Sequence, residues 1–218
     1  MSPTPIDERL VWLCRAAVKV TGVTSCGVTM VTRSGQSITA HATDHQARSV
    51  EDLQHTLGEG PGVAASESGA AVMVPDLGDR RDRTLERWPT FVGEVVGLGI
   101  RAAFAFPLLL GTSRIGALTF YRVEPGALST EEISRGWVSA DAVALTLAEQ
   151  GEALPSGVGE LDPMSVHQAA GMVMVQLGVP IDQALMRMRA TAFAEGRTVD
   201  ELAEAIVRRR RRLSEEDR

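Results

Sequence analysis

The side chains best suited to chemistry lie near the end of the chain, where arginines and small residues follow one another at helical spacing. Gly171, Arg187, Arg189 and Arg197 belong to this segment, and five consecutive arginines at 208–212 follow it. A guanidinium can hold a phosphate through paired hydrogen bonds or stack on a base. A glycine on a helix surface lets a backbone approach closely. Contact with nucleic acid is one interpretation of this combination.

Each of these residues also has a purely structural interpretation. An exposed arginine on a helix is usually solvated, and Gly171 could simply ease helix packing. The arginines at 208–212 end a stretch that starts with Asp200 and Glu201, an order that suits the helix dipole. We therefore expect helix electrostatics to explain this block, and the arginines within the preceding helices to make the contacts.

Other residue clusters favour neither a metal site nor catalysis. The segment "HATDH" places His41, Asp44 and His45 together, with His55 nearby, but a second group of ligands is missing, so we expect a solvated loop. The glycines of "GEGPG" lack a dinucleotide-binding pattern around them, and we expect a loop there with no phosphate-binding role. Cys14 falls within an amphipathic helix, where a buried thiol is the default. We expect no metal and no enzymatic activity.

Charge and composition exclude further classes. Lys19 is the only lysine, which rules out a P-loop and the downstream lysine of a phosphoacceptor receiver domain. The net charge is −6, yet the part from residue 161 onward holds nine arginines and nine acids and is neutral. The sequence has no apolar run of membrane-spanning length and no signal-peptide pattern. We expect a cytoplasmic protein that does not enter a membrane.

The first 150 residues predict an α+β fold. Apolar residues at helical spacing predict helices over 6–20 and 130–150, the latter opened by a Ser129–Glu132 capping box. Alternating residues in 25–43 and 101–122 predict two hairpins, and 56–77 predicts a Gly-Pro loop, a short helix and a strand that Pro75 ends. This order indicates an antiparallel sheet flanked by helices.

The remaining residues predict a linker and three short helices. Gly, Pro and Ser in 151–163 indicate the linker. The first helix begins near Ser165 and stops before Gly178, and the second ends at Gly196. The third begins at Thr198, with Glu201 completing a capping box, and its apolar face runs on to Leu213.

Residues 5–150 resemble a GAF domain, a sensory α/β module. The resemblance rests on "LGEGPGVAASESGAAVMVPDL" and "GIRAAFAFPLLLGTSRIGALTFYR" in this order. It implies a pocket for a small-molecule ligand. The family's cyclic-nucleotide signature is absent, and no cysteine lies where a bilin would attach, so the ligand and any cofactor stay unknown.

Residues 164–213 resemble an ANTAR domain, a three-helix RNA-binding antiterminator module. The resemblance rests on the pattern Q-A-x-G-M followed by A-L-x-R-x-R-A-x-A-F. Ala170 stands where the family often has a lysine, and Met188 where it often has a leucine. A GAF domain followed by an ANTAR domain is a familiar pairing in actinobacterial regulators.

The two resemblances together imply a homodimer that binds paired RNA hairpins in a nascent transcript and prevents the terminator from forming. The residues expected to contact RNA are Gln168, Ala170, Gly171, Arg187, Arg189, Thr191 and Arg197. Two other hypotheses stay open: the three helices could dock a partner protein, or the third helix could enter a DNA major groove. The latter ranks lowest, because that helix offers few side chains that read bases.

Overall fold

The computed structural model describes residues 5–31, 37–79, 81–150 and 165–214, which form two compact units. The predicted linker, 151–163, lies outside these residues. The helices are α1 (Pro5–Thr21), α2 (His45–Leu57), α3 (Pro61–Ser68), the 3-10 helix η1 (Arg83–Arg87), α4 (Pro89–Gly97), α5 (Thr130–Gln150), α6 (Ser165–Leu177), α7 (Ile181–Ala194) and α8 (Val199–Val207). The strands are β1 (Ser25–Val31), β2 (Ser37–Ala42), β3 (Val72–Val74), β4 (Ala102–Leu110) and β5 (Ser113–Arg122).

The larger unit is built around a five-stranded sheet in the order β2-β1-β5-β4-β3. Every neighbouring pair of strands is antiparallel, and both predicted hairpins are present as β1–β2 and β4–β5. The short helix and strand predicted between them are α3 and β3, with Pro75 directly after β3. The predicted α+β class, an antiparallel sheet flanked by helices and followed by three helices, is confirmed.

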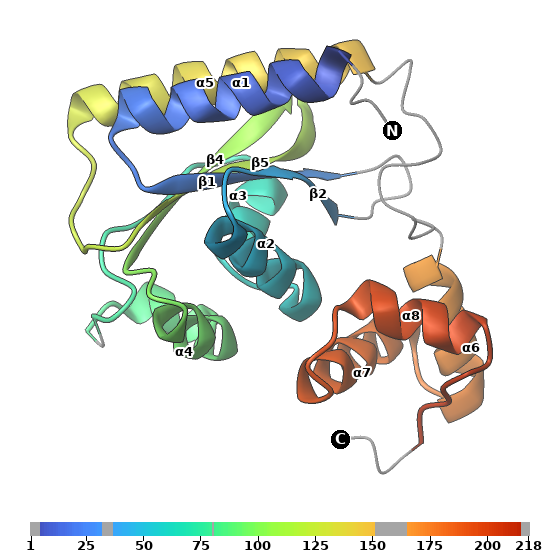
Figure 1. Cartoon of the computed structure of the whole chain (residues 1–218). Coiled ribbons are helices and arrows are strands. Elements are labelled where there is room, and N and C mark those ends of the chain that lie inside the picture. The colour runs from blue at the N-terminus through green and yellow to red at the C-terminus, as the bar shows by residue number, and fades with distance from the viewer. Residues whose placement is uncertain (1–4, 32–36, 80, 151–164, 215–218) are drawn as a thin grey trace. The chain divides into compact units, whose positions relative to one another are not determined.

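Helices α1 and α5 lie side by side over one face of the sheet (Figure 1). The residues of β4 and β5 that face them are large and apolar, and they form the main core with the inner faces of both helices. The ring of Phe106 makes edge-to-face contacts with Phe120 and Trp137, at centroid distances of 5.7 and 5.4 Å. Because side chains alternate along a strand, the opposite face must use the intervening positions.

The opposite face carries small or polar residues, and α2 and α3 cover it (Figure 1). Ala65 of α3 packs on Ala105 and Ala117 of the sheet, so helix α3 lies close to the sheet there. Gly27 has a similar role, because a Cβ at this position would lie 2.2 Å from Oε1 of Glu51. This glycine leaves room for a buried carboxyl group on α2.

Helix α2 was not predicted from the sequence. Asp44, expected in a solvated loop, begins this helix, because its carboxylate accepts a hydrogen bond of 2.7 Å from the backbone N–H of Ala47. The helix buries Ala47 and Val50 together with Glu51 and Gln54. These two polar residues interrupt the apolar stripe that would otherwise mark a helix.

Glu51 and Gln54 belong to a hydrogen-bonded network inside the larger unit. The hydroxyl of Tyr121 donates to Oε1 of Glu51 at 2.7 Å, and that of Thr29 donates to Oε2 at 2.6 Å. Gln54 donates to the Tyr121 oxygen at 3.0 Å and accepts from the backbone N–H of Gly62 at 2.7 Å. The network therefore ties α2 to β1, β5 and the start of α3.

Burial sets the protonation of this network. Loss of solvent raises the pKa of Glu51 from 4.5 to about 7, although the hydrogen bonds from Thr29 and Tyr121 act in the opposite direction. Burial also raises the pKa of Tyr121 well above 10, so its hydroxyl stays protonated and donates at neutral pH. Ionisation of Glu51 thus costs the folded state on the order of 3 kcal/mol relative to the unfolded chain.

We predict that the substitution Glu51→Gln flattens the pH dependence of stability between about pH 4.5 and 7. In the native protein the folded state holds a proton that the unfolded state has lost, so the free energy of unfolding should fall as pH rises through this window. The neutral amide removes this difference while it keeps the shape of the carboxyl group. Urea denaturation at several pH values measures the effect, and equal slopes for both proteins would contradict it.

Candidate nucleic-acid interface

The smaller unit is held together by small residues on three short helices. Its fully buried positions are Ala169, Ala170 and Val173 of α6, Ala184, Met188 and Ala192 of α7, and Val199, Leu202, Ala203 and Ile206 of α8. Alanines at facing positions allow the helix axes to approach closely. The predicted bounds of the first two helices agree with α6 and α7, and Gly178 and Gly196 follow them with positive φ of 64° and 63°.

Helix α8 begins as predicted but ends earlier. Thr198 and Glu201 form the expected capping box. The expectation that the arginines at 208–212 end the helix is wrong, because α8 stops at Val207. Arg209 adopts a left-handed φ of 56°, and the backbone N–H of Arg210 donates to the Ala205 carbonyl at 2.8 Å. This is a Schellman termination, and it turns the chain away from the helix axis.

After this turn the chain is held against the three helices. Leu213 is buried in their core, with 1% of its surface exposed. The side-chain amide of Gln176 on α6 donates to the Leu213 carbonyl. Arg211 donates two hydrogen bonds, of 3.0 and 2.9 Å, to one carboxylate oxygen of Glu195 at the end of α7. The arginine block is therefore a fixed part of the fold.

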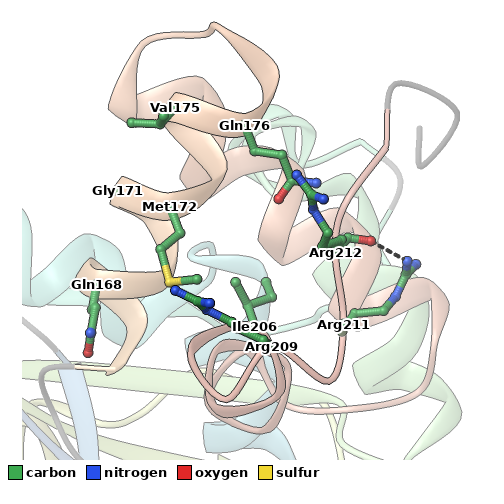
Figure 2. A pocket seen from close by; sticks show the side chains of 9 residues that line it. All are labelled: Gln168, Gly171, Met172, Val175, Gln176, Ile206, Arg209, Arg211 and Arg212. Atoms are coloured by element: carbon green, nitrogen blue, oxygen red, sulfur yellow. Dashed lines mark hydrogen bonds between the residues drawn. The ribbon is translucent and has the colours of Figure 1, made fainter.

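This returning segment and α6 enclose a hollow of about 650 Å³ (Figure 2). Helix α6 contributes Gln168, Gly171, Met172, Val175 and Gln176, which share one stripe of the helix. The opposite side is formed by Ile206, Arg209, Arg211 and Arg212. The hollow thus has an apolar floor with two amides and three guanidinium groups around it.

The structure places two of the predicted contact residues, Gln168 and Gly171, in this hollow. Apart from its chain neighbours and its own helix backbone, a Cβ built on Gly171 would meet no atom of the described residues within 4 Å, so packing does not explain the glycine. Ala170, which we expected to contact RNA from the exposed side of the first helix, is instead fully buried in the core. Thr191 is also buried, and its hydroxyl has no hydrogen-bond partner among the described residues.

The predicted arginines of α7 lie apart from the hollow. Arg187 and Arg189 leave the helix on either side of Met188, which points into the core. Arg187 is half-buried and makes no ion pair with any described residue. Arg197 is engaged within the unit, because it pairs with Glu195 at 3.3 Å and donates to the Glu201 carbonyl at 2.8 Å. Arg197 therefore connects the end of α7 to α8.

Sequence reasoning missed most of the hollow. Met172, Val175 and Gln176 were not proposed, and Arg209, Arg211 and Arg212 were assigned to a helix end. The spacing of Gln168, Gly171, Met172 and Val175, at i, i+3, i+4 and i+7, could have indicated a second stripe on α6. No comparable sequence pattern predicts that the chain folds back after α8, because a left-handed conformation, as at Arg209, is unusual for a residue other than glycine.

In the ranges 5–31, 37–79, 81–150 and 165–214, no group of three or more His, Cys, Asp or Glu side chains could hold a metal ion. Within the same ranges no single helix is long and apolar enough to cross a membrane, although α6 and α7, bent by 105°, would pass together on length and composition alone.

Solved structures similar to this chain support the fold of the larger unit. One is the GAF domain of an Acinetobacter phosphoenolpyruvate-protein phosphotransferase, with 14% identity, a TM-score of 0.52 and coverage of 74% of this chain and 90% of that one. Another is the GAF domain of the corresponding Coxiella burnetii protein, with 13% identity, a TM-score of 0.50 and coverage of 67% and 85%. No curated protein matches the chain.

Family models match both parts of the chain. The model of the GAF domain matches residues 4–148, and that of the ANTAR domain matches residues 165–207. The first match includes the sheet, α1 to α4 and most of α5, and the second includes α6, α7 and α8. ANTAR is an RNA-binding antitermination domain and GAF a sensory one, so both are regulatory. The chain therefore belongs to the GAF-domain family and is a GAF and ANTAR domain regulator.

Proposed function

We propose that this protein binds paired RNA hairpins in a nascent transcript and thereby keeps the terminator hairpin from forming. The observation that supports this most is the ANTAR match over residues 165–207, which form three helices packed around one core. In this proposal polymerase reads on while the protein holds the alternative RNA structure. Because the partner is a nascent transcript, the protein acts in the cytoplasm.

Helix α7 provides the positive charge for the RNA backbone. Its buried residues Ala184, Met188 and Ala192 fix the rotation of the helix, so Arg187 and Arg189 are presented on its two flanks. RNA is recognised by unpaired bases, 2′-hydroxyl groups and phosphates, and guanidinium groups suit all three. Ala170 and Thr191 are left out of the proposed contacts because both are buried.

We predict that Arg187→Ala and Arg189→Ala each weaken binding to a tandem-hairpin RNA and make it less sensitive to salt. Each phosphate contact that is lost should lower the slope of log K against log[salt] by roughly 0.7 to 0.9. Fluorescence anisotropy of labelled RNA across a salt series measures both quantities. Arg83→Ala is the matched control, because this exposed arginine of η1 removes the same charge from the other domain. Unchanged slopes in both α7 variants would exclude them as phosphate contacts.

We further propose that the protein is a homodimer joined through α1 and α5. These helices run antiparallel, since Arg9 pairs with Glu149 at 2.5 Å while Arg135 donates to the Val20 carbonyl at 2.8 Å. Their outer surface exposes large apolar side chains: Trp12 at 67%, Val20 at 44%, Val138 at 67% and Leu145 at 59%. The antiparallel arrangement brings Trp12 level with Leu145, and Val20 level with Val138. A second copy could cover both pairs in a four-helix bundle.

We predict that the double substitution Trp12→Asp and Leu145→Asp gives a monomer. Burying two carboxylates in each half of the bundle would cost far more than the lost apolar contact alone. Sedimentation or light scattering at micromolar concentration should give twice the chain mass for the native protein and the chain mass for the variant. Leu98→Asp, at an exposed apolar residue after α4, should leave the dimer intact. A native protein that is monomeric under these conditions would contradict the proposal.

The sensory input enters through the GAF domain, and we propose a small-molecule ligand on the sheet face that α2 and α3 cover. This face holds the network of Glu51, Gln54, Thr29 and Tyr121. A ligand bound there would exchange hydrogen bonds with these groups, and so could shift α2 relative to the sheet.

A further inference from the structure

The hollow beside α6 is formed by tertiary structure. Its outer wall exists because the chain reverses at Arg209 and is pinned by Leu213 and by the bond from Gln176 to the Leu213 carbonyl. Gly171 opens the opposite wall, since a Cβ there would meet no atom of the described residues within 4 Å, apart from its chain neighbours and its own helix backbone. This volume is therefore preformed and accessible from outside the domain.

The hollow combines apolar surface with hydrogen-bonding groups. Met172 and Val175 of α6 and Ile206 of α8 provide the apolar surface, and Val175 is 77% exposed. Gln168 lies at one end of the stripe and Gln176 at the other (Figure 2). The Gln176 amide nitrogen is used by the Leu213 carbonyl, so its oxygen is left as an acceptor. A flat, partly apolar ligand with polar edges suits such a surface.

Charge at the rim selects an anion. Arg208 pairs with Glu204 at 2.6 Å, and Arg211 with Glu195 at 2.9 Å. Arg209 and Arg212 are exposed, and neither side chain is paired with an acid among the residues that the structure describes. Both line the hollow, so two guanidinium groups face any ligand that enters it (Figure 2).

We propose that this hollow holds one unpaired nucleotide of the bound RNA, with its base over Met172 and Val175 and its phosphate against Arg209 and Arg212. The inference rests on the proposed function and adds a second contact surface to the arginines of α7. A volume of about 650 Å³ lies within the range of small-molecule pockets and accommodates a nucleotide. The flat face of a base packs against apolar side chains or stacks on a guanidinium plane, while the amides of Gln168 and Gln176 meet its polar edges.

The test fills the hollow without a change of charge. Gly171→Leu places a side chain in the open space beside Met172, and leucine favours a helix more than glycine does. His167→Leu is the matched control, since it adds the same side chain to an exposed position of α6 outside the hollow. The full-length proteins are titrated with a hairpin RNA that has an unpaired loop, and with a blunt duplex RNA of equal phosphate number.

We predict that Gly171→Leu weakens binding to the loop-containing hairpin about tenfold or more, and leaves duplex binding within about twofold, as expected when an apolar contact with one base and the hydrogen bonds at its edges are lost. His167→Leu should bind both RNAs as the native protein does. With 2-aminopurine at each loop position in turn, one position should change its fluorescence on binding, and Gly171→Leu should abolish that change.

The arginines give an independent prediction. Arg209→Gln and Arg212→Gln should each weaken hairpin binding by roughly three- to tenfold, as expected for a charge-assisted contact to phosphate. Arg210→Gln, a neighbour of the same block that does not line the hollow, should change it less than about twofold. Equal effects of the three substitutions would show only general charge and would overturn the site.

The outcomes separate this inference from the proposed function. A native protein that binds the hairpin, with Gly171→Leu binding it equally well, overturns the nucleotide site and leaves RNA binding intact. A native protein that binds neither RNA overturns both. Free nucleoside monophosphates are titrated as well: submillimolar binding that Gly171→Leu abolishes, without an effect of this variant on hairpin binding, would make a free nucleotide the occupant and overturn the RNA assignment.

Discussion

Close packing of three short helices is the constraint on which the RNA-binding part of the structure depends. About fifty residues bury little surface, so the helices must approach closely, and alanines at facing positions permit this. The core also fixes the rotation of each helix, and so decides which residues face outward. Ala170 is taken into the core, while the next residue, Gly171, opens onto the surface. The burial of Leu213 in the same core is what returns the arginine block across α6.

Local sequence signals predicted the elements of the C-terminal domain but only part of its surface. The glycines at 178 and 196 and the capping box at Thr198 act over a few residues, and each marked a helix end correctly. The end of α8 depends instead on the left-handed backbone of Arg209 and on the burial of Leu213, which lies further along the chain, in the core of the three helices. No local pattern reports such a tertiary contact. For this reason the sequence assigned the block to the helix, whereas α8 ends before it.

In the GAF domain, too, local patterns predicted some elements and tertiary contacts determined others. Its hairpins were predicted because alternating residues report directly on a sheet with one apolar face. Helix α2 was missed because its buried face carries Glu51 and Gln54, which pair with Tyr121 and with the backbone of Gly62. A buried carboxyl group of this kind is costly unless every polar atom is satisfied. This carboxyl group lies on the sheet face that α2 and α3 cover, where we place the sensory ligand. Its protonation is therefore linked to the proposed ligand site.

Selective RNA binding is tested by titrating three nucleic acids with the native full-length protein. A tandem-hairpin RNA, a scrambled single-stranded RNA of the same composition and a duplex DNA are titrated across the same salt series. The account predicts selective binding of the paired hairpins that persists as salt rises, because shape and unpaired bases contribute in addition to charge. Equally weak and steeply salt-dependent binding to all three would contradict it, and would leave the arginines as a charged surface suited to docking a protein.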